Sequence, residues 1–136
     1  MGDKRRLKTV LVVDDNSDVR SLLVELLELK SFQVVGTGRN GNDAVTLYEK
    51  LKPDITLLDV VMPDADGLYA LDHIREINSD AIVIMITTDL SQDTAKKLED
   101  LRATAVVYKP FDINDLLKIV NNIESTAHTG QIRFFN

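Results

Sequence analysis

Five side chains that can bind a metal ion or a phosphate group stand directly after short apolar runs. They are Asp14, Asp15, Asp59, Thr87 and Lys109. Carboxylates gathered in one cleft repel one another, and burying them unpaired is costly. A hard cation such as Mg²⁺ resolves that conflict, because its ligands are carboxylate, water and phosphate oxygens. A lysine adds a compact positive charge for phosphate, and a threonine hydroxyl can donate a hydrogen bond to it. Together these residue types predict phosphorylation of an aspartate beside a metal ion.

The apolar runs that precede these residues are rich in β-branched side chains and predict buried strands. They span Thr9–Val13, Gln33–Thr37, Ile55–Leu58, Ile82–Ile86 and Ala105–Tyr108. The segments between and after them repeat apolar residues at helical spacing, and Asn16 or Ser17 is the N-cap candidate of the first of these helices. Five strand–helix units in strict alternation predict an α/β fold, with a doubly wound parallel sheet between two layers of helices. Ligands of such sheets bind beyond the carboxyl ends of the strands, where the five polar side chains stand.

Composition excludes several other classes of protein. The 136 residues suit one compact domain, and the absence of cysteine excludes disulfides, thiolate zinc sites and cysteine nucleophiles. A net charge of −6 opposes binding of DNA over a broad surface. No apolar run approaches the roughly 18 residues that cross a membrane. We therefore expect a cytoplasmic protein that neither binds DNA nor inserts into a membrane.

The chain divides into three parts by composition and periodicity. Residues 1–6 form a basic N-terminal arm, residues 7–124 hold the five units, and residues 125–136 lack a helical pattern. The last part predicts a flexible tail, in which Phe134-Phe135 is either a docking element or a disordered end.

An ordered set of motifs in the chain resembles the response-regulator receiver domains of two-component signalling, the CheY-like family. The matching residues are Val12-Val13-Asp14-Asp15, Asp59 with Met62-Pro63 and Gly67, Thr87, and Lys109-Pro110-Phe111. The resemblance covers residues 7–124. It implies a flavodoxin-like (βα)5 domain whose five parallel strands lie in the order 2-1-3-4-5.

The same resemblance implies a role for each acidic residue. Asp59 would be the phosphoacceptor and also a metal ligand. Asp15 would bind Mg²⁺ directly, Asp14 would assist through water, and the backbone carbonyl of Val61 would complete the protein's share, with Mn²⁺ as an alternative metal.

The family pattern further implies that Thr87 and Lys109 hold the phosphoryl oxygens, and that the bond before Pro110 is cis. The phosphoryl donor would be a phosphohistidine of a histidine kinase or a histidine phosphotransfer protein. We expect a stand-alone receiver that switches binding of a downstream protein target. Such a protein catalyses its own phosphorylation and dephosphorylation, without turning over a separate substrate.

Two positions depart from the family pattern. Val106 stands where the family usually has an aromatic residue, whose ring moves into the space left when the conserved hydroxyl, here that of Thr87, moves inward. Thr88 stands where the family usually has a small residue. Because residues 106 and 108 share one face of a strand, we hypothesise that Tyr108 supplies aromatic surface to the region that faces partners. The switch candidates are thus Thr87, Val106 and Tyr108.

Two other interpretations compete with a receiver domain. Residues 36–41, GTGRNG, match the glycine fingerprint of dinucleotide-binding Rossmann folds, and Asp59 follows at a spacing near that of the ribose-binding acid. This alternative leaves the other four polar side chains unexplained. A haloacid-dehalogenase-type phosphatase also uses an aspartate and Mg²⁺, but it needs an acid two residues after its nucleophile, where Asn16 follows Asp14.

Overall fold

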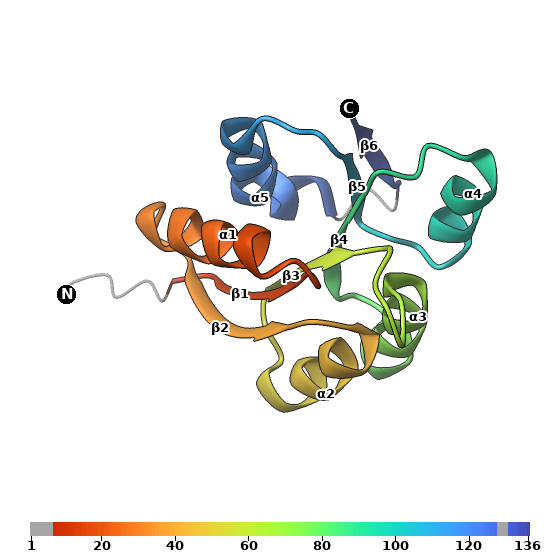
Figure 1. Cartoon of the computed structure of the whole chain (residues 1–136), viewed down its shortest axis with the longest axis horizontal. Helices are drawn as coiled ribbons and strands as arrows, with labels where there is room; N and C mark the ends of the chain where they lie inside the picture. The colour runs from red at the N-terminus through yellow and green to blue at the C-terminus, as the bar shows by residue number, and fades with distance from the viewer. Residues whose placement is uncertain (1–6, 128–130) are drawn as a thin grey trace.

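The computed structural model describes residues 7–127 and 131–136, which form one parallel α/β sheet structure (Figure 1). In these residues the elements are β1 (Thr9–Val13), α1 (Ser17–Leu29), β2 (Gln33–Gly38), α2 (Gly41–Leu51), β3 (Ile55–Asp59), α3 (Gly67–Ile77), β4 (Ile82–Thr87), α4 (Gln92–Asp100), β5 (Ala105–Tyr108), α5 (Ile113–Ala127) and β6 (Arg133–Phe135). The alternation of strand and helix follows the predicted units, and the strand bounds differ from the predicted ones by at most one residue. The predicted basic arm, residues 1–6, lies outside the described residues.

Helices cover both faces of the sheet, and the inner strands β1, β3 and β4 are almost completely buried. Helices α1 and α5 pack on one face and bury the side chains of Leu27 and Leu116 completely. Helices α2, α3 and α4 pack on the other face, around side chains such as Leu71 and Leu98 (Figure 1). Alternate residues of a strand point to opposite faces, and this period separates the two cores. The rigid sheet between them holds the strand ends, and the residues that follow them, in fixed positions.

The strand order departs from the predicted one at a single edge. The described strands lie in the order β2-β1-β3-β4-β5-β6, and all neighbours are parallel. The five predicted strands keep the order 2-1-3-4-5, but the five-stranded sheet is a wrong prediction, because Arg133–Phe135 add a sixth strand beside β5. The tail predicted to begin at residue 125 without a helical pattern begins later, because α5 continues to Ala127. Residues 128–130 of the predicted tail lie outside the described residues.

Side-chain caps set the points at which two helices near the strand ends begin. The Asn16 side chain accepts hydrogen bonds from the backbone amides of Asp18 and Val19, which fixes the first turn of α1 directly after β1. The Asp66 side chain accepts a hydrogen bond from the amide of Tyr69 and starts α3. Each cap therefore ends a loop that begins at one of the strand-end acids.

Among the described residues, no helix is both long and apolar enough to cross a membrane.

Candidate functional site

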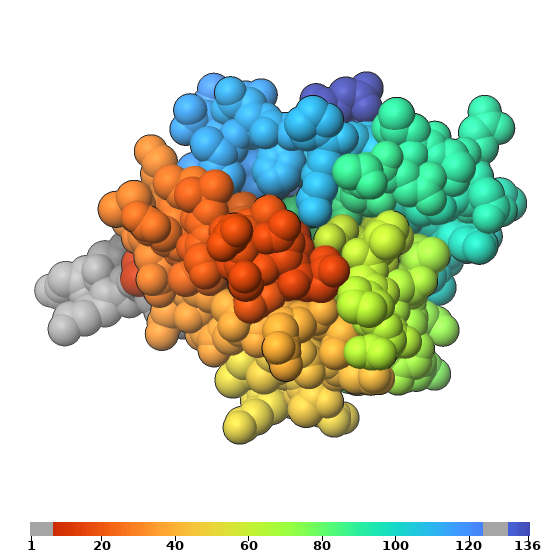
Figure 2. Space-filling model, viewed as in Figure 1, coloured from red at the N-terminus to blue at the C-terminus, as the bar shows by residue number. Residues whose placement is uncertain are grey.

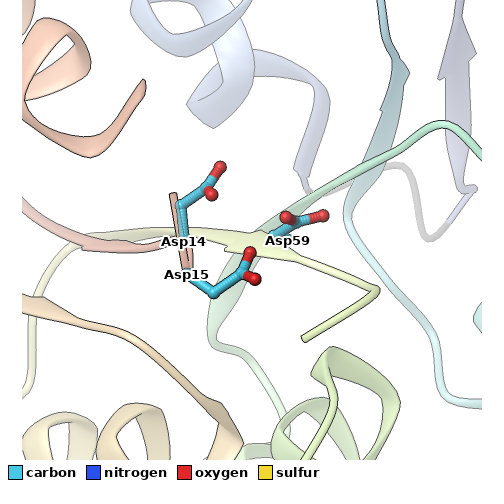
Figure 3. A group of neighbouring side chains, drawn as sticks. All are labelled: Asp14, Asp15 and Asp59. Atoms are coloured by element: carbon cyan, nitrogen blue, oxygen red, sulfur yellow. The ribbon is translucent and has the colours of Figure 1, made fainter. Parts of the chain in front are cut away.

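Three carboxylates meet at the carboxyl edge of the sheet, as the strand pattern predicts. β1 and β3 are neighbours, with Val13 opposite Leu58, so the next residues along, Asp14 and Asp59, lie side by side. One carboxylate oxygen from each of Asp14, Asp15 and Asp59 lies within 4.8 Å of the others (Figure 3). The segments that follow β1 and β3 also meet on one face of the molecule (Figure 2). Three oxygen donors at this separation are the kind of set that a hard divalent cation binds.

A single lysine lies between the two buried acids. The Nζ atom of Lys109 is 3.4 Å from a carboxylate oxygen of Asp14 and 3.4 Å from one of Asp59. Asp14 and Asp59 are almost completely buried, with 2% and 6% of their surface exposed, whereas Asp15 is exposed. One ammonium group thus faces two buried carboxylates, and the cluster carries excess negative charge.

Burial alters the protonation of Asp59. Loss of solvent raises the pKa of its carboxyl group from 3.8 to about 6, because the charged form is disfavoured away from water. Lys109 opposes this rise, and the neighbouring charges of Asp14 and Asp15 add to it. A cation that approaches the cluster would favour the ionised carboxylate, which is the form that can act as a nucleophile.

Thr87 reaches the same edge as the last residue of β4, and its side chain is completely buried. Its hydroxyl oxygen accepts a hydrogen bond of 2.9 Å from the backbone amide of Asp89. Its backbone carbonyl accepts one of 2.8 Å from the amide of Lys109. This backbone hydrogen bond holds the residue that carries the hydroxyl, Thr87, beside the residue that carries the ammonium, Lys109. The peptide bond between Lys109 and Pro110 is cis.

The side chain of Asp89 links Thr87 to the start of α4. Asp89 accepts hydrogen bonds from the Thr94 hydroxyl and the Ser91 amide, and these bonds lower the pKa of its carboxyl group. Val61, whose backbone carbonyl the family resemblance assigns to the metal, lies in the loop after β3 with an exposed side chain.

Two further residues hold the acidic loops in place, and the sequence analysis gave neither of them a role. The backbone of Gly67 lies against that of Asp59, and a Cβ atom there would overlap the Asp59 carbonyl oxygen. The guanidinium of Arg20 donates a 2.7 Å hydrogen bond to the backbone carbonyl of Asp14. Gly67 stands among the family motifs, which is a usable signal, but the spacing of Arg20 carries none.

The two other switch candidates lie on one face of β5, as the strand period predicts. Val106 is completely buried in the core beneath α3 and α4, and Tyr108 packs against the same core while remaining partly exposed. The Tyr108 ring stacks on Phe134 of β6, with ring centroids 6.3 Å apart. The aromatic surface beside the lysine is thus shared with the C-terminal strand.

The glycine motif of residues 36–41 serves packing. Gly36 and Gly38 lie within β2, an edge strand of the sheet, so they form no phosphate-binding loop. A Cβ atom on Gly41 would lie 2.5 Å from the carbonyl oxygen of Asp66, so this glycine allows α2 to approach the loop before α3. Nothing in this arrangement supports the dinucleotide-binding alternative.

Comparisons with known proteins agree with the geometry. The family model of the response regulator receiver domain matches residues 10–121. The chain belongs to the response regulator receiver family. It is 34% identical, over 85% of its length and 96% of the relative, to the chemotaxis protein CheY of Halobacterium salinarum. It is also 34% identical to the transcriptional regulatory protein PdtaR of Mycobacterium tuberculosis, over 92% of this chain and 63% of that protein.

The solved structures give the same assignment. In the CheX-CheY-BeF3-Mg complex of Borrelia burgdorferi, the matching chain superposes with a TM-score of 0.81 and 29% identity, over 86% of this chain and 89% of that one. The phosphatase alternative finds no support among these relatives.

Proposed function

We propose that Asp59 is the residue of this receiver domain that accepts the phosphoryl group. The observation that carries the proposal is the position of Lys109, whose Nζ atom lies 3.4 Å from the carboxylates of both Asp59 and Asp14. Asp59 ends β3, which lies between β1, followed by Asp14 and Asp15, and β4, which ends in Thr87. The lysine that can bind a phosphoryl oxygen thus contacts this carboxylate, and the threonine ends the neighbouring strand.

The reaction is a displacement at phosphorus. A carboxylate oxygen of Asp59 attacks the phosphorus of a phosphohistidine. The new P–O bond forms as the P–N bond breaks, and the imidazole nitrogen keeps the electron pair of that bond. The Lys109 ammonium then faces the charge of the phosphoryl oxygens. The Thr87 hydroxyl, an acceptor in its bond from Asp89, still carries a proton that it can donate to one of them.

The acidic cluster fits a divalent cation. Asp14, Asp15 and Asp59 present three oxygens within 4.8 Å, and hard oxygen donors suit Mg²⁺ or Mn²⁺. We assign Asp15 and Asp59 as direct ligands, Asp14 as a ligand through water and the Val61 carbonyl as the fourth protein group. When bound, the cation neutralises charge on the carboxylates and the transferring phosphoryl group.

The partners follow from this chemistry. The donor is a phosphohistidine of a histidine kinase or a histidine phosphotransfer protein, and the exchange takes place in the cytoplasm. The output is altered binding to a downstream protein. The solved CheY complex supports this last step by similarity, because there a related receiver is bound to CheX.

Mass spectrometry after incubation with acetyl phosphate and Mg²⁺ tests the assignment. We expect one phosphoryl group on the parent protein, located at Asp59 by peptide mapping after borohydride trapping, and none on Asp59→Asn. The matched control is Asp64→Asn, which changes an exposed acid in the following loop and should leave incorporation intact. Undiminished incorporation by Asp59→Asn would overturn the assignment.

A further inference from the structure

The edge strand of this receiver domain, β6, lies directly beside β5, the strand that precedes Lys109. β6 pairs with β5 in parallel, with Ala105 opposite Arg133 and Val106 opposite Phe134. It lies between α4 and α5 and covers the edge of β5 that the sheet would otherwise present (Figure 1). An uncovered strand edge offers its backbone groups to another extended segment, so β6 occupies a surface that can bind a partner.

The side chains of the C-terminal segment hold it only lightly. Phe135 packs against the core beneath α1 and α5, and Ile132 packs against the core on the other face. Neither is fully buried, and Phe134 keeps 40% of its surface exposed. The strand is three residues long, whereas every side chain of its neighbour β5 except that of Tyr108 is buried. Elements with little buried apolar surface open at the lowest cost in free energy.

A short series of contacts joins this strand to the acidic cluster. Lys109 contacts Asp59 at 3.4 Å, and the preceding residue, Tyr108, stacks on Phe134 with an interplanar angle of 16°. Tyr108 also lies opposite Thr87 in the β4–β5 register. The two residues that would hold phosphoryl oxygens are thus the sequence neighbour and the strand partner of the tyrosine on which Phe134 rests.

We propose that residues 131–136 form a strap over the edge of β5, which phosphorylation of Asp59 releases. In the unphosphorylated protein, Lys109 contacts the carboxylates of Asp14 and Asp59, and Tyr108 stacks on Phe134. When Lys109 and Thr87 turn toward a phosphoryl group, the backbone that carries Tyr108 follows, and the stack and the strap lose their contact. Release uncovers the backbone edge of β5 and the Tyr108 ring for a downstream protein. This inference rests on the proposed phosphorylation of Asp59.

Coupling of this kind is reciprocal. Beryllofluoride binds reversibly in place of the phosphoryl group, so its affinity reports this coupling at equilibrium. If its binding weakens the strap, a strap that cannot leave must weaken the binding of beryllofluoride. The chain contains no cysteine, so an engineered pair would be its only thiols. The double variant Ala105→Cys/Arg133→Cys places a disulfide between directly opposite residues of β5 and β6. It leaves Phe134, Phe135 and Tyr108 unchanged.

The first experiment records NMR contacts between the Tyr108 and Phe134 rings in the full chain with Mg²⁺, before and after beryllofluoride is added. We expect ring–ring cross-peaks with Mg²⁺ alone and their loss once beryllofluoride is bound. The second measures the affinity of the double-cysteine variant for beryllofluoride in the presence of Mg²⁺. We expect an affinity several-fold lower in the oxidised than in the reduced protein, and no effect of oxidation on Arg133→Cys alone.

The outcomes separate the two proposals. Cross-peaks that persist with beryllofluoride bound, or equal beryllofluoride affinities of the oxidised and reduced variant, would overturn the strap while leaving Asp59 as the acceptor. If neither acetyl phosphate nor beryllofluoride reacts at Asp59 in the parent protein, the proposed function falls, and the strap falls with it.

Discussion

The backbone of Gly67 packs against the carbonyl group of Asp59, and no residue with a Cβ atom fits this contact. The obstacles are backbone atoms of Asp59 and Val60, which cannot move aside as the end of a flexible side chain can. The start of α3 and the acidic cluster are therefore fixed by the same contact. The amide of Gly67 strengthens it by donating a 2.8 Å hydrogen bond to the Val60 carbonyl.

We expect Gly67→Ala to destabilise the fold by roughly 1–3 kcal/mol, the usual cost of forcing a methyl group into packed surroundings. It should also slow phosphorylation, because the backbone that must shift to make room is that of Asp59 and Val60. Denaturant unfolding and acetyl phosphate kinetics measure the two effects. Gly36→Ala is the matched control, since its methyl group would meet the mobile end of the Leu51 side chain at 2.8 Å. Equal losses of stability and of phosphorylation rate in Gly67→Ala and Gly36→Ala would contradict this account.

The fold and the acidic cluster were predictable for one physical reason. The carboxyl ends of parallel strands meet at one edge, so Asp14 and Asp59 had to converge once β1 and β3 were neighbours. The sixth strand was not predictable in this way. Arg133–Phe135 have no strand period of their own, and their conformation depends on pairing with the edge of β5. The contact of Arg20 with the Asp14 carbonyl was missed for a similar reason, because only the folded loop brings them together.

The raised pKa of Asp59 predicts that the free energy of unfolding of the metal-free protein depends on pH. Because burial raises this pKa from 3.8 to about 6, the folded state binds the proton more tightly than the unfolded chain does. The resulting stabilisation is complete below pH 3.8 and is lost as pH rises through about 6. The neutral side chain of Asp59→Asn avoids this loss.

The gain in stability of Asp59→Asn over the parent should therefore grow between pH 4 and pH 7.5 when measured in EDTA. Thermal unfolding across that range checks the prediction, with Asp64→Asn as an exposed control. A gain that does not change with pH would show that Asp59 is not the group responsible.

Magnesium should raise the melting temperature of the protein, because a cation that binds the folded cluster and not the unfolded chain stabilises the folded state. We expect Asp15→Ala to abolish this rise and to leave the metal-free protein as stable as the parent or more so, since one repelling charge is gone. Asp18→Ala, an exposed acid in the first turn of α1, should keep the rise. A full magnesium response in Asp15→Ala would remove Asp15 from the ligands.

Thr88 should lengthen the life of the aspartyl phosphate. Its β-branched side chain is exposed directly after the buried Thr87. We expect it to narrow the path of a water molecule toward the phosphoryl group. We expect Thr88→Ala to lose phosphate faster than the parent after the donor is removed, with unchanged stability in denaturant. Equal rates of dephosphorylation would dispose of the steric explanation.

The response of α4 should depend on Asp89, whereas that of β6 should depend on Tyr108. The Thr87 hydroxyl accepts a hydrogen bond from the Asp89 amide, and the Asp89 carboxylate accepts bonds from Ser91 and Thr94 at the start of α4. A Thr87 hydroxyl that turns toward a phosphoryl group thus pulls on the first turn of that helix.

Amide NMR shifts with and without beryllofluoride separate the two routes. Asp89→Ala should lose the response of α4 and keep that of β6, and Tyr108→Ala should do the reverse. Loss of the α4 response in Tyr108→Ala would instead show that the tyrosine carries the signal to both elements.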